Sequence, residues 1–315
     1  MQTSARSYNP AADPAVRRTM IGATDGAAII GVSSWRTAVD VYLEIIGAKL
    51  PEDIDSQEQI IIGRLLEDDV AQMYEQETGR TLVPSSGTQR HPVHDFIACH
   101  PDYHVHGETG LVECKTAGIS APQSRDARME WGAEGSDQIP RQYLVQCHHQ
   151  MLVTGARWVD LAALIGGRGL VIHRVERDEE FLTWYEGELV KFWREHIERR
   201  VPPEPRTVGD CSILYRQDSG TTVQGTPDTL LHWRELLACR ARAKAAEADA
   251  EVHEIAIKAF MGDAAVLEID GQVAATWKSD KQGRIDTAAL KRAHPDIAAQ
   301  FTKAPSRRFL PKEAK

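Results

Sequence analysis

The chain has 315 residues, and the 42% that are hydrophobic are enough for a core in one large domain or two modest ones. It has no apolar run of about 18 residues and no basic start followed by an apolar segment, so neither a membrane span nor a secretory signal is expected. The formal net charge of −9 argues mildly against nucleic-acid binding, because phosphate contacts favour Lys and Arg. It does not exclude such binding, since residues 278–315 carry 10 basic and 4 acidic side chains.

Regular patterns of apolar and capping residues predict the elements of the first part of the chain. Helices are expected at residues 24–30 (with Thr24 and Asp25 as capping residues), 37–46, 57–78, 139–154 and 178–200. Strands are expected at residues 88–91, 96–100, 111–116, 158–165 and 170–176, and a mobile loop at 117–138. This order of helices and strands indicates an α/β domain with a mixed central sheet.

The proline-rich segment at 201–205 breaks these patterns and predicts a domain boundary, giving domains at residues 1–204 and 205–315. Beyond it we expect a long, Ala- and charge-rich helix at 228–261 and a hairpin around the Asp270-Gly271 turn. A short helix at 286–293 completes a small α+β appendage of unknown role. The chain holds 5 cysteines with no C-x-x-C pair, a usage typical of a reduced, intracellular protein.

The segment from His100 to Lys115 holds the most informative group of side chains. In a strand over residues 111–116, Glu113 and Lys115 point to the same face because they lie two residues apart. Asp102 ends the preceding apolar run, which we expect to pair with that strand. Two carboxylates and a lysine on one sheet face suit a divalent metal and a water to be activated. The alternative is a surface hairpin with scattered charges.

Two features outside this segment favour the chemical interpretation. Glu67 lies on the apolar part of a predicted helix, where a carboxylate is normally avoided. Gln146 and Gln150 lie four residues apart on the 139–154 helix, with Tyr143 one turn before Gln146. A helix laid across the sheet would bring Gln146 over the same site.

These motifs, in this order, resemble those of the phage lambda exonuclease and YqaJ viral recombinase family, within the PD-(D/E)xK nuclease superfamily. The matching segments are Gly63-Arg64-Leu65-Leu66-Glu67, His100-Pro101-Asp102, Val112-Glu113-Cys114-Lys115 and Tyr143-Leu144-Val145-Gln146. The resemblance covers roughly residues 15–200 and implies a restriction-endonuclease-like core. It also implies a Mg²⁺-dependent exonuclease, with Mn²⁺ as a substitute, that digests linear duplex DNA from the 5′ end and leaves a 3′ single strand.

The resemblance further implies the setting in which the protein works. The expected partners are double-stranded DNA ends and a single-strand annealing protein of the same phage or prophage. The chain is expected to assemble as a homotrimeric ring around DNA in the cytoplasm of a bacterial host.

The resemblance assigns a role to each residue of the group. Asp102, Glu113 and the Cys114 carbonyl would bind the ion, and Glu67 would help to hold it or a second one. Lys115 would position the attacking water, assist its deprotonation or offset charge, and Gln146 would orient Lys115 or the water.

The resemblance also implies a basic pocket for the 5′ phosphate. Arg17 and Thr24 match its N-terminal motif loosely, and Arg18 is an alternative to Arg17. The sequence departs from the family pattern at His100, where a serine is expected, and after Lys115, where a second basic ligand is missing. Arg125 or Arg128 is the proposed replacement.

Three other functions stay open on the sequence alone. The same catalytic group would serve an endonuclease of restriction or repair, and a protein that only binds DNA ends would have no need of it. A zinc-stabilised module is conceivable because histidines gather around Cys99 and in Cys147-His148-His149, but their spacing matches no familiar zinc site. Without a four-cysteine set, an iron–sulfur nuclease is disfavoured.

Overall fold

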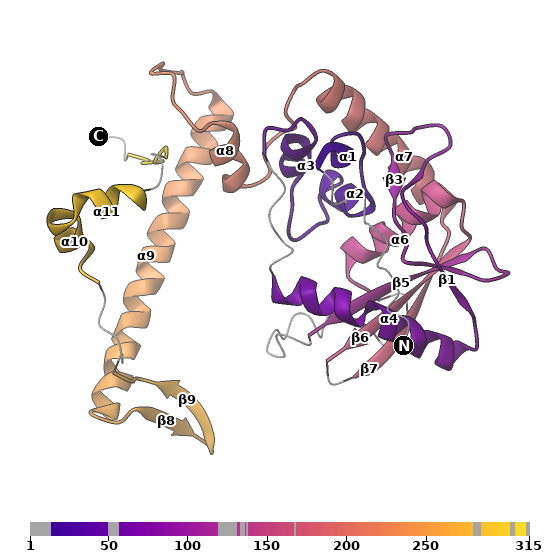
Figure 1. Ribbon diagram of the computed structural model, residues 1–315. Helices are drawn as coiled ribbons and strands as arrows, with labels where there is room; N and C mark the ends of the chain where they lie inside the picture. The colour runs from indigo at the N-terminus through magenta and orange to yellow at the C-terminus, as the bar shows by residue number, and fades with distance from the viewer. Residues whose placement is uncertain are drawn as a thin grey trace. The chain divides into compact units, whose positions relative to one another are not determined.

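The computed structural model describes residues 14–49, 57–118, 131–132, 136, 138–166, 168–279, 285–302 and 306–312. The chain divides into two compact units, Met1–Leu214 and Tyr215–Lys315 (Figure 1). The contact boundary therefore follows α8 (Val208–Leu214), a helix that the sequence patterns did not predict. Among the described residues, no helix is long and apolar enough to cross a membrane.

The first unit is built around a mixed five-stranded sheet in the order β1-β4-β5-β6-β7. Its strands are β1 (Leu82–Pro84), β4 (Tyr103–Val105), β5 (Gly110–Ala117), β6 (Trp158–Ile165) and β7 (Gly169–Glu176). The central pair, β5 and β6, is parallel, and the other pairs are antiparallel. The predicted α/β class with a mixed central sheet is therefore confirmed.

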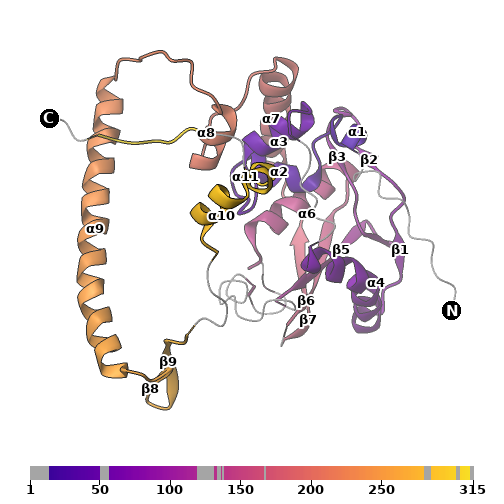
Figure 2. The same cartoon turned by 60° about the vertical axis from the view of Figure 1, so that its left-hand side comes forward.

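Helices cover both faces of this sheet (Figures 1 and 2). α4 (Glu58–Thr78) packs its Val70 and Tyr74 against one face, and α6 (Arg141–Thr154) packs Cys147 and Met151 against the other. A further apolar layer on the outer side of α6 joins α2 (Ala23–Ile29), α3 (Ala38–Ile45) and α7 (Glu179–Phe192). A short helix, α1 (Pro14–Arg17), precedes them, and a π-helical segment, Trp193–Glu198, follows α7.

Most helix ends lie close to the capping residues that predicted them. Thr37 caps α3, and Gly79 and Gly155 end α4 and α6 with positive φ angles of 69° and 75°, which glycine adopts without steric cost. The prediction for α2 was wrong at its start. Gly22 is the N-cap, and Thr24 lies inside the first turn, because the Asp25 carboxylate accepts a hydrogen bond from the Gly22 N–H.

The predicted pairing of the two strands around Asp102 was also wrong. β3 (Ala98–Cys99) pairs with β2 (Gln89–Arg90) in a separate small sheet, and the strand beside β5 is β4. The chain turns after Pro101, so residues 103–105 form the hairpin with β5. The sequence did not reveal β4, because three residues are too few for a visible alternation.

The second unit contains the expected long helix, hairpin and short helix. These are α9 (Pro227–Met261), β8 (Val266–Ile269) with β9 (Gln272–Thr276), and α10 (Thr287–Ala293). A helix that was not predicted, α11 (Pro295–Gln300), follows directly. In the hairpin turn, Asp270 and Gly271 both have positive φ angles, as a two-residue Asp-Gly turn requires.

Candidate active site

The β5 strand places Glu113 and Lys115 on its α6-facing side, as their spacing predicted. The Lys115 ammonium donates a hydrogen bond to Glu113 Oε1, and the Glu113 side chain is only 3% exposed. Cys114 points to the opposite face, where it packs with Val70 and Tyr74 of α4. The strand therefore directs an ion pair with a buried carboxylate toward α6.

Two amides of α6 hold the Glu113 carboxylate from the other side. Gln146 Nε2 donates to Glu113 Oε1 at 2.5 Å, and Gln150 Nε2 donates to Oε2 at 2.5 Å. Residues four apart lie on one helix face, so both amides reach the same carboxylate. Gln146 was a predicted site residue; Gln150 was noticed for its spacing but not assigned to the site. One ammonium and two amides therefore hold the Glu113 carboxylate in place.

Asp102 is bound to the same strand. Its Oδ2 accepts a hydrogen bond from the Cys114 backbone N–H at 2.8 Å, which ties it to the middle of β5. The pKa of Asp102 is raised well above its usual value, first by burial and then by the negative charge of Glu113, while Lys115 opposes the shift and Glu67 adds to it. Glu113, Lys115 and Glu67 thus lie within electrostatic reach of Asp102.

Lys115 is a cation at neutral pH. Burial alone would lower its pKa, but the carboxylates of Glu113 and Asp102 outweigh burial and raise it. Its ammonium also lies 5.3 Å from the centre of the Tyr143 ring, a cation–π distance. The Trp35 ring lies 6.0 Å from Tyr143, and Trp35 is 66% exposed. The Tyr143 ring therefore lies next to both the Lys115 ammonium and the ring of an exposed tryptophan.

The donor chemistry of this site suits a hard divalent cation, because carboxylate oxygens are the ligands that Mg²⁺ prefers. The raised pKa of Asp102 points the same way, since a cation would relieve the repulsion among the carboxylates. Within the described ranges, however, no three His, Cys, Asp or Glu side chains form a ready-made metal-binding group. Glu113 instead directs its oxygens to Lys115, Gln146 and Gln150.

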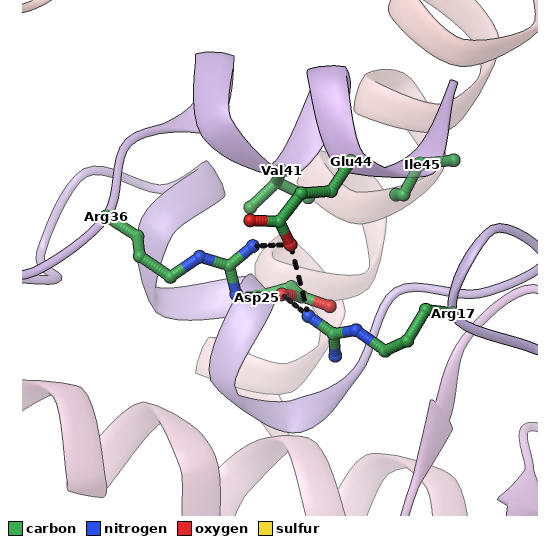
Figure 3. A pocket seen from close by; sticks show the side chains of 6 residues that line it. All are labelled: Arg17, Asp25, Arg36, Val41, Glu44 and Ile45. Carbon is green, nitrogen blue, oxygen red and sulfur yellow. Dashed lines mark hydrogen bonds and ion pairs between the residues drawn. The ribbon is translucent and has the colours of Figure 1, made fainter. Parts of the chain in front are cut away.

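The predicted phosphate ligand Arg17 lies in a different pocket, formed by α2, α3 and their connections (Figure 3). Its guanidinium lies 3.1 Å from Asp25 and 3.6 Å from Glu44. Arg36, which the sequence did not mark as a site residue, contacts the same carboxylates at 2.7 and 2.6 Å. Burial raises the pKa of Asp25, but the two arginines outweigh it and lower the pKa overall. The pocket is thus a balanced cluster of two arginines and two carboxylates.

The other predicted phosphate ligands do not join this cluster. Thr24 is exposed on α2. Arg18 is also exposed, and its guanidinium lies beside Gly47 at the end of α3. Arg125 and Arg128 lie outside the described residues, as does most of the segment 117–138 that was predicted to be a mobile loop.

The comparison with known proteins agrees with these motifs. Residues 14–157 match the YqaJ-like viral recombinase domain. The chain is 30% identical over 305 residues to the uncharacterized protein YqaJ of Bacillus subtilis (strain 168), a match that covers 94% of this chain and 92% of that protein. The chain belongs to the YqaJ family. The predicted membership in the YqaJ family is therefore confirmed.

Two solved structures are also similar to this YqaJ-family chain. The alkaline exonuclease LHK-Exo of Laribacter hongkongensis is 20% identical, with a TM-score of 0.46, over 59% of this chain and 95% of that one. A phage related exonuclease of Haemophilus somnus 129PT is 13% identical, with a TM-score of 0.43, over 58% of this chain and 96% of that one.

Proposed function

We propose that the protein is a Mg²⁺-dependent deoxyribonuclease that digests linear double-stranded DNA from its 5′ ends and leaves 3′ single-stranded tails. The observation that carries the proposal is the Glu113–Lys115 pair, whose carboxylate is buried, held by two amides of α6 and placed beside Asp102. A protein that only binds DNA ends has no need to bury and orient such a group, because burying charges costs free energy. Function is the usual reason for accepting that cost.

The described side chains divide the work of phosphodiester hydrolysis among them. Asp102, Glu113 and the Cys114 carbonyl would hold Mg²⁺, with Glu67 as a further ligand, and the ion would polarise the phosphate and lower the pKa of the attacking water. Lys115 is charged at neutral pH, so its ammonium offsets negative charge that develops on the phosphate oxygens. Gln146 keeps the Glu113 carboxylate, and through it Lys115, in place.

We take the setting of the reaction from the family resemblance. The tails left by such an enzyme would be the substrate of a single-strand annealing protein made by the same phage or prophage, in the cytoplasm of a bacterial host. A homotrimeric ring would let an acidic chain stay on its substrate by enclosing the DNA in a locally basic channel. Arg17 would bind the 5′ phosphate, aided by Arg18 or by Arg125 or Arg128, and it would have to exchange Asp25 and Glu44 for that ligand.

The deciding experiment is digestion of 5′-phosphorylated linear duplex DNA with Mg²⁺, beside closed circular DNA and a Lys115→Ala control. We expect linear DNA to be lost from its 5′ ends, the circles to stay intact and the variant to be inactive. Strands labelled at the 5′ or the 3′ end report polarity, and chelation with EDTA reports metal dependence. Cutting of circles would replace this proposal with an endonuclease. Ends that are bound but not cut in Mg²⁺ or Mn²⁺ would replace it with a non-catalytic end-binding protein.

The 5′-phosphate pocket has its own test. Wild type should prefer a 5′-phosphate to a 5′-hydroxyl end, and Arg17→Ala should lose that preference. An Arg17→Ala variant that keeps the full preference would remove Arg17 from the pocket and leave the catalytic assignment intact.

A further inference from the structure

The long helix of the second unit, α9, exposes an apolar stripe for most of its length. Stripe residues recur every three or four positions, so they share one face of the helix. They are Leu230, Trp233, Leu237, Ala241, Ala245, Ala248, Val252, Ile255 and Ala259. Trp233 and Leu237 are half-buried, and the rest of the stripe is exposed. Small alanines in the middle of the stripe leave room for another helix to approach closely.

The charges of α9 divide it into two halves of opposite sign. From Pro227 to Lys244 the helix carries four basic and two acidic residues, and from Ala245 to Met261 it carries one basic and four acidic residues. Within these halves, Arg240 and Arg242 flank Ala241, whereas Glu247 and Asp249 flank Ala248. Their side chains are exposed on both edges of the stripe.

We propose that α9 pairs antiparallel with α9 of a second copy of this chain, with the centre of the pair between Lys244 and Ala245. In this register Ala241 lies opposite Ala248 of the second copy, and Leu237 lies opposite Val252. An antiparallel pair brings the same edges of the two helices together, so Arg242 meets Asp249 and Arg240 meets Glu247. By symmetry each contact occurs twice. Apolar residues and charges are therefore matched in one register.

A parallel pair would not satisfy the same charges. It brings opposite edges of the two helices together at the same level, so Arg240 would meet Arg242, and Glu247 would meet Asp249. Like charges at such positions are destabilising, whereas opposite charges select partner and orientation. The charge pattern thus favours a second copy and fixes its direction.

Disulfide crosslinking of the full-length protein tests the register. In a background with the exposed cysteines replaced (Cys211→Ser, Cys239→Ser), an Ala241→Cys copy mixed with an Ala248→Cys copy should form a crosslinked heterodimer under mild oxidation. Each copy alone should crosslink far less, because equal positions lie about 10 Å apart along the axis of an antiparallel pair at 1.5 Å per residue. A matched mixture of Ala243→Cys and Ala246→Cys, on the outer face at the same level, should not crosslink.

Charge exchange tests the partner choice with the same readout. Crosslinking should fall several-fold when both copies carry Arg240→Glu and Arg242→Glu. Crosslinking should return when the copy with Arg240→Glu and Arg242→Glu is mixed with a copy that carries Glu247→Arg and Asp249→Arg, because this mixed pair restores opposite charges on both edges.

Two results are possible besides the expected one. Self-crosslinking of the single Cys copies would show a parallel pair, and absence of any crosslink would show that α9 does not pair with itself. Both results would overturn the proposal. The disulfide readout is independent of nuclease activity and of how the first unit assembles.

Discussion

Asp102 makes the folded protein less stable as the pH rises. Its pKa is raised by burial and by the neighbouring carboxylates of Glu113 and Glu67. A folded state that holds a proton more tightly than the unfolded state loses stability as pH rises, from about 3.9, the pKa of an unfolded Asp, up through the raised pKa. At neutral pH, Asp102 therefore lowers the stability of the folded state.

Asp102→Asn should raise the melting temperature at pH 7 while abolishing cleavage. The amide removes the charge and keeps an oxygen that can accept the hydrogen bond from the Cys114 N–H. We expect a gain of about 1 kcal/mol, or roughly 2–4 °C. The gap between variant and wild type should widen as pH rises from 4 to 8 in thermal unfolding with EDTA.

Adding Mg²⁺ should close this gap, because a cation that binds the folded state stabilises wild type more than the variant. A variant that is less stable than wild type at every pH would show that the Asp102 charge is already compensated without metal.

Gln150 is the second residue whose replacement should affect the site. Its Nε2 donates to Glu113 Oε2, but its Oε1 is buried without a hydrogen-bond partner among the described residues. Gln150→Met keeps the volume and removes both the donor and this unpartnered oxygen. Because this amide helps to hold the Glu113 carboxylate, we expect kcat to fall about tenfold or more. Stability should change little, because the loss of a hydrogen bond to a charged group, roughly 1.5–3 kcal/mol, is offset by removal of the buried oxygen that has no partner in the described part of the chain. Gln72→Met, at an exposed position of α4, is the matched control, and an unchanged kcat in Gln150→Met would remove Gln150 from the site.

At the scale of elements, local signals predicted the structure well where they were strong. Capped helices such as α3 and α4 and the long strands β6 and β7 lie close to the expected residues. The short strands β1 and β4 and the pairing of β3 could not be predicted, because they depend on contacts between distant parts of the chain.

The same distinction applies to the candidate site. The period of two along β5 predicted that Glu113 and Lys115 share a face, which requires only local geometry. The convergence of Gln150 on Glu113 and the neutralisation of Arg17 by Asp25 depend on tertiary packing. The spacing of Gln146 and Gln150 indicated the contact with Glu113, but nothing in the sequence indicated the ion pair between Arg17 and Asp25.

The contact of α2 with α7 depends on one glycine. A Cβ atom built on Gly26 would lie 1.6 Å from the hydroxyl of Tyr185, and that hydroxyl contacts His149 Nδ1 at 2.8 Å. Gly26→Ala should therefore destabilise the protein by about 1–3 kcal/mol through overpacking. Gly187→Ala, on the exposed face of α7 with nothing within 4 Å of the new Cβ, should stabilise it by roughly 0.5–1 kcal/mol through helix propensity. Chemical denaturation measures both, and equal effects of the two changes would contradict the packing argument.

At the scale of the whole molecule, the end of the first unit can be located by its hydrogen bonds. Asp210 on α8 is buried, and its carboxylate accepts hydrogen bonds from Thr37 Oγ1 and from the backbone N–H groups of Arg206 and Thr207. These contacts join α8 to the start of α3. α8 should therefore belong with the first unit, although the proline-rich segment 201–205 precedes it.

Two truncations test this assignment. A chain ending after Leu214 should unfold at a temperature close to that of the first unit in the full protein and should keep its activity on linear DNA. A chain ending after Glu204 lacks Asp210, so the Thr37 hydroxyl loses the carboxylate to which it donates a hydrogen bond. This chain should be less stable by about 1–3 kcal/mol. Thermal unfolding of both chains decides the matter, with Asp210→Ala in the full protein as the control that removes only the hydrogen bonds of Asp210. If both truncations unfold at the same temperature, α8 contributes nothing to the first unit and the boundary belongs at the prolines. If the longer truncation folds but no longer cuts DNA, the second unit takes part in the reaction itself.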